Sequence, residues 1–101
     1  MKIRLAKVSD IKQGEIKTFE YDGEPIAICN VEGNFYAFLD SCTHMEFPLS
    51  GGKLDGEVIT CPAHGARFNV RSGEALSMPA VTPLKKFSTM VNGDDIYIEV
   101  D

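Results

Sequence analysis

Two short segments of the chain each combine a cysteine with a histidine, and together they could bind a metal. Residues 42–44 read Cys-Thr-His and residues 61–64 read Cys-Pro-Ala-His, with 16 residues between the two segments. Both histidines of the chain and two of its three cysteines fall inside them. Thiolate and imidazole ligands favour zinc, copper or iron–sulfur centres over magnesium or calcium. The candidate ligands are Cys42, His44, Cys61 and His64.

The ligand pattern leaves two kinds of metal centre open. Zinc fingers usually place two cysteines in one loop and two histidines on a helix. Here each segment mixes the two ligand types, and no helical pattern follows Cys61. Mixed pairs suit a binuclear iron–sulfur cluster in which the cysteines bind one iron and the histidines bind the other. The residues therefore favour a cluster, with a structural zinc module as the alternative.

The rest of the sequence predicts an all-β domain that positions these segments. Short apolar runs alternate with Gly, Asn, Asp and Pro, which is typical of short antiparallel strands. The expected class is a small antiparallel β-sandwich or open barrel. Strands are expected at residues 3–7, 16–19, 25–29, 35–39, 58–60, 67–70, 87–91 and 96–100, and turns at 21–23, 32–34, 71–73 and 92–94. In the last turn, Asn-Gly fits the left-handed backbone angles of a tight hairpin.

Two stretches, residues 40–53 and 62–66, fit no strand. Three of the four candidate ligands lie in these stretches, and the fourth, Cys61, directly precedes the second one. Functional side chains are often carried by loops on a rigid scaffold. The cluster-binding loops are therefore expected at about residues 40–53 and 61–68. Residues 8–13 are the only stretch expected to hold a helical turn, with Ser9 as its cap. Cys29 belongs to a predicted strand, where core packing of a small side chain explains it.

The composition indicates one soluble domain covering residues 1–101. Of the 101 residues, 44% are hydrophobic and 25% charged, which is ordinary for a globular protein. The formal net charge of -5 disfavours nucleic acid as a partner and suits docking to a basic patch on a protein. No apolar run approaches the roughly 20 residues needed to span a bilayer, and no secretory signal is recognised at the start. We therefore expect a cytoplasmic protein without a membrane partner, and three cysteines argue against a disulfide framework.

The cysteine and histidine segments resemble the Rieske family. The resemblance rests on Cys-x-His, the 16-residue spacer and Cys-Pro-x-His-Gly across residues 42–65, and further matches extend it over about residues 35–100. Those matches include Pro48-Leu49-Ser50, Gly52 and Phe68. The resemblance implies a small antiparallel β domain with the cluster-binding loops inserted as a tip. It also implies a Rieske-type [2Fe–2S] cluster on the four candidate ligands, with the imidazoles near the surface.

Four further positions bear on the redox potential within this family. High-potential members carry two additional cysteines that bridge the loops, and the matching positions here are Phe47 and Ala63. Those members also aim a serine and a tyrosine hydroxyl at the cluster sulfurs, and the matching positions are Ala66 and Phe68. Donors to the sulfurs stabilise the extra charge of the reduced cluster and raise its potential. Their absence predicts a potential of roughly -150 mV, at the lower end of the Rieske range.

Within this family, the chain resembles the stand-alone ferredoxin component of multicomponent aromatic-ring dioxygenase systems. It ends at Asp101 and offers no further histidine for the mononuclear iron of a terminal oxygenase. The resemblance implies a monomeric one-electron carrier that passes electrons from a flavoprotein reductase to a terminal oxygenase and catalyses no reaction itself. No Gly-x-Gly-x-x-Gly motif indicates a nicotinamide or flavin site. The alternative within the family is the small subunit of an NADH-nitrite reductase.

Overall fold

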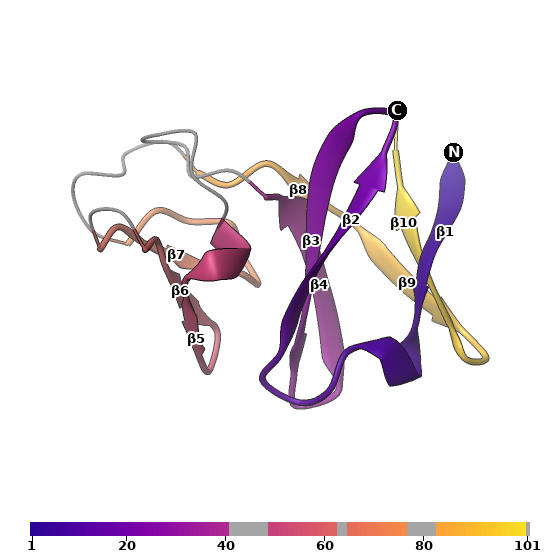
Figure 1. Cartoon of the computed structure of the whole chain (residues 1–101), viewed down its shortest axis with the longest axis horizontal. Coiled ribbons are helices and arrows are strands. Elements are labelled where there is room, and N and C mark those ends of the chain that lie inside the picture. The colour runs from indigo at the N-terminus through magenta and orange to yellow at the C-terminus, as the bar shows by residue number, and fades with distance from the viewer. Residues whose placement is uncertain (41–48, 63–64, 77–82, 101) are drawn as a thin grey trace.

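The protein is built from antiparallel sheets that enclose two hydrophobic cores (Figure 1). The computed structural model describes residues 1–40, 49–62, 65–76 and 83–100. Two short 3-10 helices, η1 (Val8–Asp10) and η2 (Leu49–Gly51), are the only helical elements of the described residues. The strands are β1 (Lys2–Lys7), β2 (Ile16–Tyr21), β3 (Glu24–Val31), β4 (Asn34–Leu39), β5 (Lys53–Asp55), β6 (Val58–Thr60), β7 (Arg67–Asn69), β8 (Lys86–Phe87), β9 (Thr89–Asn92) and β10 (Asp95–Glu99).

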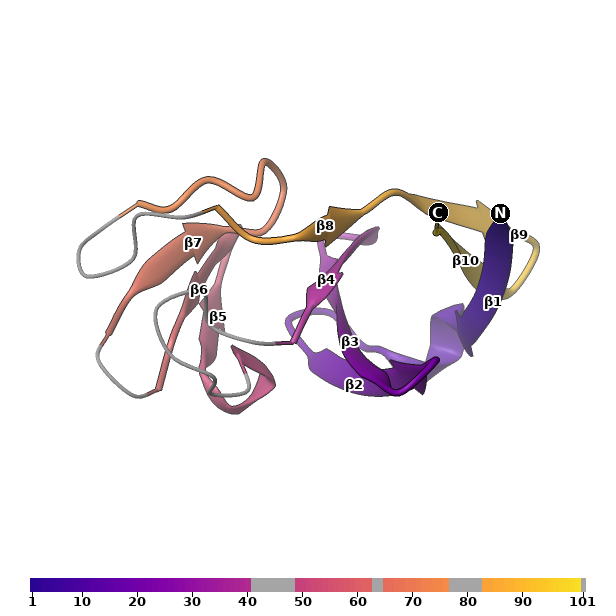
Figure 2. The same ribbon diagram turned by 90° about the horizontal axis from the view of Figure 1, so that it is seen from above.

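The strands form three sheets, ordered β1-β10-β9, β2-β3-β4-β8 and β5-β6-β7. Every strand pair is antiparallel. Figure 2 shows the first two sheets curving around a shared interior as an open barrel, which we call the base. The third sheet, with η2, stands at one end of the base, and we call it the tip. Because the tip lies between β4 and β8 in the sequence, the predicted all-β barrel with an inserted tip is confirmed.

Strand β3 is buried on both faces, and its two faces pack into different hydrophobic cores, one inside the base and one shared with the tip. Ile26 and Ile28 belong to the core inside the base, while Ala27 and Cys29 belong to a second core that includes residues of the tip. Alternate residues of a strand point to opposite faces, so one strand supplies both cores. The central sheet is therefore the wall on which the tip is mounted.

The segment before and through β8 holds the tip and the base together. The N–H of Leu84 donates to the carbonyl of Gly73 in the tip at 2.8 Å. One residue later, the carbonyl of Lys85 accepts a bond of 2.8 Å from the N–H of Leu39 at the end of β4. Figure 2 shows this segment running from one part of the molecule to the other. Backbone bonds on both sides fix where the tip stands relative to the base.

The predicted hairpins of the base form, with one correction. Asp22 and Glu32 have φ angles of 53° at the β2–β3 and β3–β4 turns, which fits two-residue turns of the left-handed kind. In the β9–β10 hairpin, however, Asn92 pairs with Asp95, so the turn residues are Gly93 and Asp94. Only Gly93 has a positive φ there, of 63°. The predicted left-handed angle at Asn92 is therefore wrong, and the turn uses glycine at its first central position.

Other local predictions also need correction. Ser9 lies inside η1 and does not cap it; the cap position is Lys7, whose N–H donates to the carboxylate of Asp10 at 2.9 Å. The predicted strand at residues 87–91 is divided at Ser88, because β8 pairs with β4 whereas β9 pairs with β10. Helix η2 lies within the stretch at residues 40–53 that was predicted to be without regular structure, and the unpredicted strand β5 begins at the last residue of that stretch, Lys53. Strand β5 has three residues and one apolar side chain, too little for an alternation pattern.

Candidate metal centre

Cys61 follows directly after β6 in the tip, and its residue is only 2% exposed. Its N–H donates to the carbonyl of Ala66 at 2.7 Å, and its carbonyl accepts from the N–H of Gly65 at 3.1 Å. Gly65 has a φ of 73°, which favours glycine. These bonds tie Cys61 to Gly65 and Ala66, so the backbone on either side of residues 63–64 is held together.

The described residues include one of the four predicted ligands. Cys42, His44 and His64 lie outside them, as do Phe47 and Ala63. Within the described ranges, no group of three or more His, Cys, Asp or Glu side chains could hold a metal ion. A complete ligand set on Cys42, His44, Cys61 and His64 therefore stays a prediction.

Both ligand-bearing stretches border a shared hollow of about 460 Å³ beside Cys61. Gly51, Gly52 and Lys53 line it from the end of the first stretch. Cys61 and Gly65 line it from the second. The structure thus brings the two stretches together although 16 residues separate the predicted ligand segments. This placement is what a metal shared between the two stretches requires.

The residues behind Cys61 form an apolar wall. Ala66 and Phe68, at the two positions where high-potential family members carry hydroxyls, are 0% exposed. They pack in one core with Leu49, Ile59 and Cys61. Neither alanine nor phenylalanine has a side-chain donor. A thiol beside buried apolar side chains suits a soft, sulfur-rich centre such as an iron–sulfur cluster. Ala66 and Phe68 offer no hydroxyl that could raise the redox potential of such a cluster.

Cys29 lies in β3 and is completely buried. Its burial raises the pKa of the thiol to about 12, since desolvation penalises the thiolate. A protonated thiol is a poor metal ligand, because the thiolate is the form that binds metals. The prediction that Cys29 is a packing residue is confirmed.

Asp40 is a buried carboxylate at the start of the first ligand-bearing stretch, and the residue is 5% exposed. It accepts hydrogen bonds from the hydroxyl of Thr18 at 2.6 Å and from the hydroxyl of Ser50 at 2.7 Å. The sequence predictions gave neither Asp40 nor Thr18 a role. The hydroxyl donors to Asp40 lie 22 and 10 residues away in the sequence. The local sequence therefore gave only one indication of a role for Asp40, an acidic residue directly after an apolar strand.

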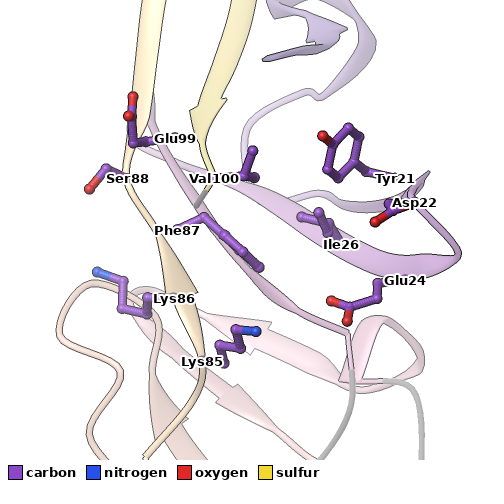
Figure 3. A pocket seen from close by; sticks show the side chains of 10 residues that line it. All are labelled: Tyr21, Asp22, Glu24, Ile26, Lys85, Lys86, Phe87, Ser88, Glu99 and Val100. Atoms are coloured by element: carbon purple, nitrogen blue, oxygen red, sulfur yellow. The ribbon is translucent and has the colours of Figure 1, made fainter. Parts of the chain in front are cut away.

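A separate hollow of about 380 Å³ lies in the base (Figure 3). Its lining carries charges of both signs, with Lys85 and Lys86 on one side and Glu24 and Glu99 among the others. None of the described residues that line it is a cysteine or a histidine. This hollow is therefore not a candidate metal centre of thiolate and imidazole ligands.

The fold and the Cys61 turn define a class of small β proteins that hold a metal centre between two loops at one end of a barrel. Comparison with known families makes the class specific: the Rieske [2Fe-2S] domain matches residues 1–88. The chain belongs to this family, and its cofactor is a Rieske-type [2Fe–2S] cluster. The predicted family and cofactor are confirmed.

Individual relatives narrow the assignment within the family. The ferredoxin component of biphenyl 2,3-dioxygenase from Rhodococcus jostii (strain RHA1) is 39% identical over 98 residues, covering 97% of this chain and 92% of the relative. The ferredoxin in a solved complex of reduced oxygenase and oxidised ferredoxin of carbazole 1,9a-dioxygenase is 39% identical, with a TM-score of 0.91. That match covers 96% of this chain and 91% of the other. The predicted ferredoxin class is confirmed.

The nitrite reductase alternative is represented by a structure with lower sequence identity. A solved structure described as the small subunit of a nitrite reductase has a TM-score of 0.84 and 22% identity, covering 99% of each chain. At that identity the likeness shows the shared fold alone. Separately, no helix in the described part of the chain is long and apolar enough to cross a membrane.

Proposed function

We propose that this chain, as a single domain of residues 1–101, is a low-potential Rieske-type ferredoxin that carries one electron at a time between proteins. The four proposed cluster ligands are Cys42, His44, Cys61 and His64. The observation that carries the proposal is the placement of Cys61 on a closed turn directly against the end of the first ligand-bearing stretch. Each stretch then supplies one thiolate and one imidazole.

The bound cluster supplies reversible one-electron chemistry, and the surrounding residues set its conditions. Leu49, Ile59 and Phe68 are completely buried and belong to the same apolar core as Cys61. An apolar shell without hydroxyl donors leaves the added charge of the reduced state less stabilised. We therefore infer a potential of roughly -150 mV, low enough to accept electrons from a flavin and to pass them to an oxygenase.

The proposed partners are a flavoprotein reductase as donor and a terminal oxygenase as acceptor. The carbazole dioxygenase relative, solved as a complex of oxygenase and ferredoxin, supports the second partner. The net charge of -5 suits transient docking on basic protein surfaces, where it steers the encounter more than it tightens the complex. A monomeric state and a cytoplasmic location complete this proposal.

An anaerobic redox titration tests the carrier role. The purified protein is reduced with dithionite and then mixed with ferric cytochrome c, which accepts one electron. The account predicts one electron taken up and one electron delivered per chain, with a midpoint of roughly -150 mV. Uptake of no electron, or of two, contradicts it. Neighbouring oxygenase and flavin reductase genes would support the proposed partners, whereas a neighbouring sirohaem reductase gene would favour the nitrite reductase alternative.

A further inference from the structure

We propose that the carboxylate of Asp40 is a positioning group for the metal centre, because it joins the two ends of the segment that carries Cys42 and His44. The inference rests on the proposed function, in which these two residues are cluster ligands. Asp40 directly precedes the segment at residues 41–48, and Ser50 is the second residue after its end. Both residues belong to the described part of the chain.

Asp40 and Ser50 are connected by two hydrogen bonds. Oδ1 of Asp40 accepts from the backbone N–H of Ser50 at 2.8 Å, and Oδ2 accepts from the Ser50 hydroxyl at 2.7 Å. Hydrogen bonds to a carboxylate are shorter and about twice as strong as neutral ones. The low polarity of a buried site strengthens them further. The two bonds together fix η2, which contains Ser50, against the end of β4.

Two further bonds orient Asp40 on the base. Its N–H donates to the carbonyl of Pro25 at 2.9 Å, and its Oδ2 accepts from the hydroxyl of Thr18 at 2.6 Å. Hydrogen bonds to β2 and β3 therefore fix Asp40 on the base, and Asp40 in turn fixes Ser50. Ser50 and Thr18 each contribute one hydroxyl to the same oxygen, but only Ser50 lies beyond the ligand segment.

The position of η2 is passed on to the second ligand segment. Leu49 in η2 is fully buried in the core that also contains Cys61. The N–H of Gly52 donates to the carbonyl of Leu49 at 2.9 Å, and a Cβ at position 52 would overlap the carbonyl oxygen of Thr60. Because Thr60 immediately precedes Cys61, contacts run from Asp40 through η2 to the second segment. Asp40 thereby sets where the two segments stand relative to each other.

The matched pair Ser50→Ala and Thr18→Val tests this role in the cluster-loaded protein. Each variant removes one hydroxyl donor to the same carboxylate oxygen. The readouts are the rate at which a chelator removes iron, the paramagnetic resonance linewidth of the reduced cluster, and the thermal midpoint. We expect Ser50→Ala to release iron about tenfold faster than the parent and to show a broadened signal. The tenfold change corresponds to the loss of one hydrogen bond to a charged group, at about 1.4 kcal/mol per factor of ten. Thr18→Val is expected to stay within about twofold of the parent, since it keeps both Asp40–Ser50 hydrogen bonds, whereas Ser50→Ala keeps only the backbone one.

Asp40→Ala and Asp40→Asn extend the test. The alanine variant loses every acceptor and should release iron more than about tenfold faster, whereas the asparagine side chain keeps one oxygen acceptor and should restore most of the retention. Equal release rates and linewidths for Ser50→Ala and Thr18→Val would show that Asp40 only stabilises the base, and would overturn the inference. A parent protein that binds no cluster would instead refute the proposed function. If Asp40→Ala does not fold, the comparison of the two hydroxyl variants decides.

Discussion

The backbone N–H of Cys61 donates a hydrogen bond of 2.7 Å to the carbonyl oxygen of Ala66, across the turn that carries the second ligand segment. The completely buried side chain of Ala66 consequently stands at the closing pair of that turn, in the same core as Cys61. A hydroxyl placed at position 66 would therefore be buried in the core that contains Cys61, and not exposed to solvent. This relationship makes position 66 a direct test of how the protein sets its redox potential.

The variant Ala66→Ser should raise the potential. A hydroxyl that bonds a sulfur stabilises the reduced cluster more than the oxidised one, because reduction adds negative charge. We expect a rise of about 60 mV, the one-electron equivalent of about 1.4 kcal/mol. Protein-film voltammetry measures it. Ala75→Ser, which adds a hydroxyl opposite Phe68 in the tip, is the matched control and should leave the potential unchanged. An unchanged potential in Ala66→Ser would count against the proposed placement of the cluster.

The two described cysteines should differ completely in their effect on the cofactor. Cys61→Ala removes a proposed ligand and should yield a chain without bound iron. Cys29→Ala removes a buried thiol whose pKa is raised to about 12 by desolvation, and it should keep the full iron content and the red-brown colour. Iron analysis and the visible spectrum of both purified variants check this. Retention of iron by Cys61→Ala with loss in Cys29→Ala would reverse the assignment.

Cys29 should also make the stability depend on pH above about 9. In the unfolded chain the thiol has its ordinary pKa of 9.0, whereas burial in the folded protein raises this pKa to about 12. Its contribution is thus fully present below pH 9 and is lost progressively between pH 9 and 12. At pH 10.5 the loss should be about 2 kcal/mol, from 1.36 kcal/mol per pH unit. Denaturant unfolding of the parent and of Cys29→Ala at pH 8 and 10.5 measures it as a difference. A difference that does not change with pH would contradict the prediction.

Neighbouring glycines in the tip should respond differently to alanine. A Cβ at Gly52 would overlap the carbonyl oxygen of Thr60, whereas a Cβ at Gly51 would lie 3.9 Å from Cγ of Pro62, an ordinary contact. Gly52→Ala must displace the backbone just before Cys61, and overpacking of this kind costs about 1–3 kcal/mol. That loss corresponds to roughly 4–8 °C in thermal midpoint per kcal/mol. Gly51→Ala is the control and should change stability by less than about 0.5 kcal/mol. Similar midpoints for both variants would show that the packing of η2 against β6 is loose.

Local turn chemistry explains why most hairpins were predictable. The two-residue turns at Asp22 and Glu32 each place a glycine second, which identifies both the turn and the strands on either side. The division at Ser88 was not predictable, because it depends on β8 leaving β9 to pair with β4. The role of Asp40 was missed for a similar reason. Its donors Thr18 and Ser50 reach it only through the tertiary fold. The candidate ligands, by contrast, could be read from residue type and spacing alone.

Electron paramagnetic resonance of the dithionite-reduced protein, with iron and zinc counted on the same sample, tests the central claim most directly. The account predicts about two irons per chain and a rhombic signal with the low average g value of mixed nitrogen and sulfur ligation. One zinc per chain without a signal, persisting after attempted cluster reconstitution, would contradict the electron-carrier account.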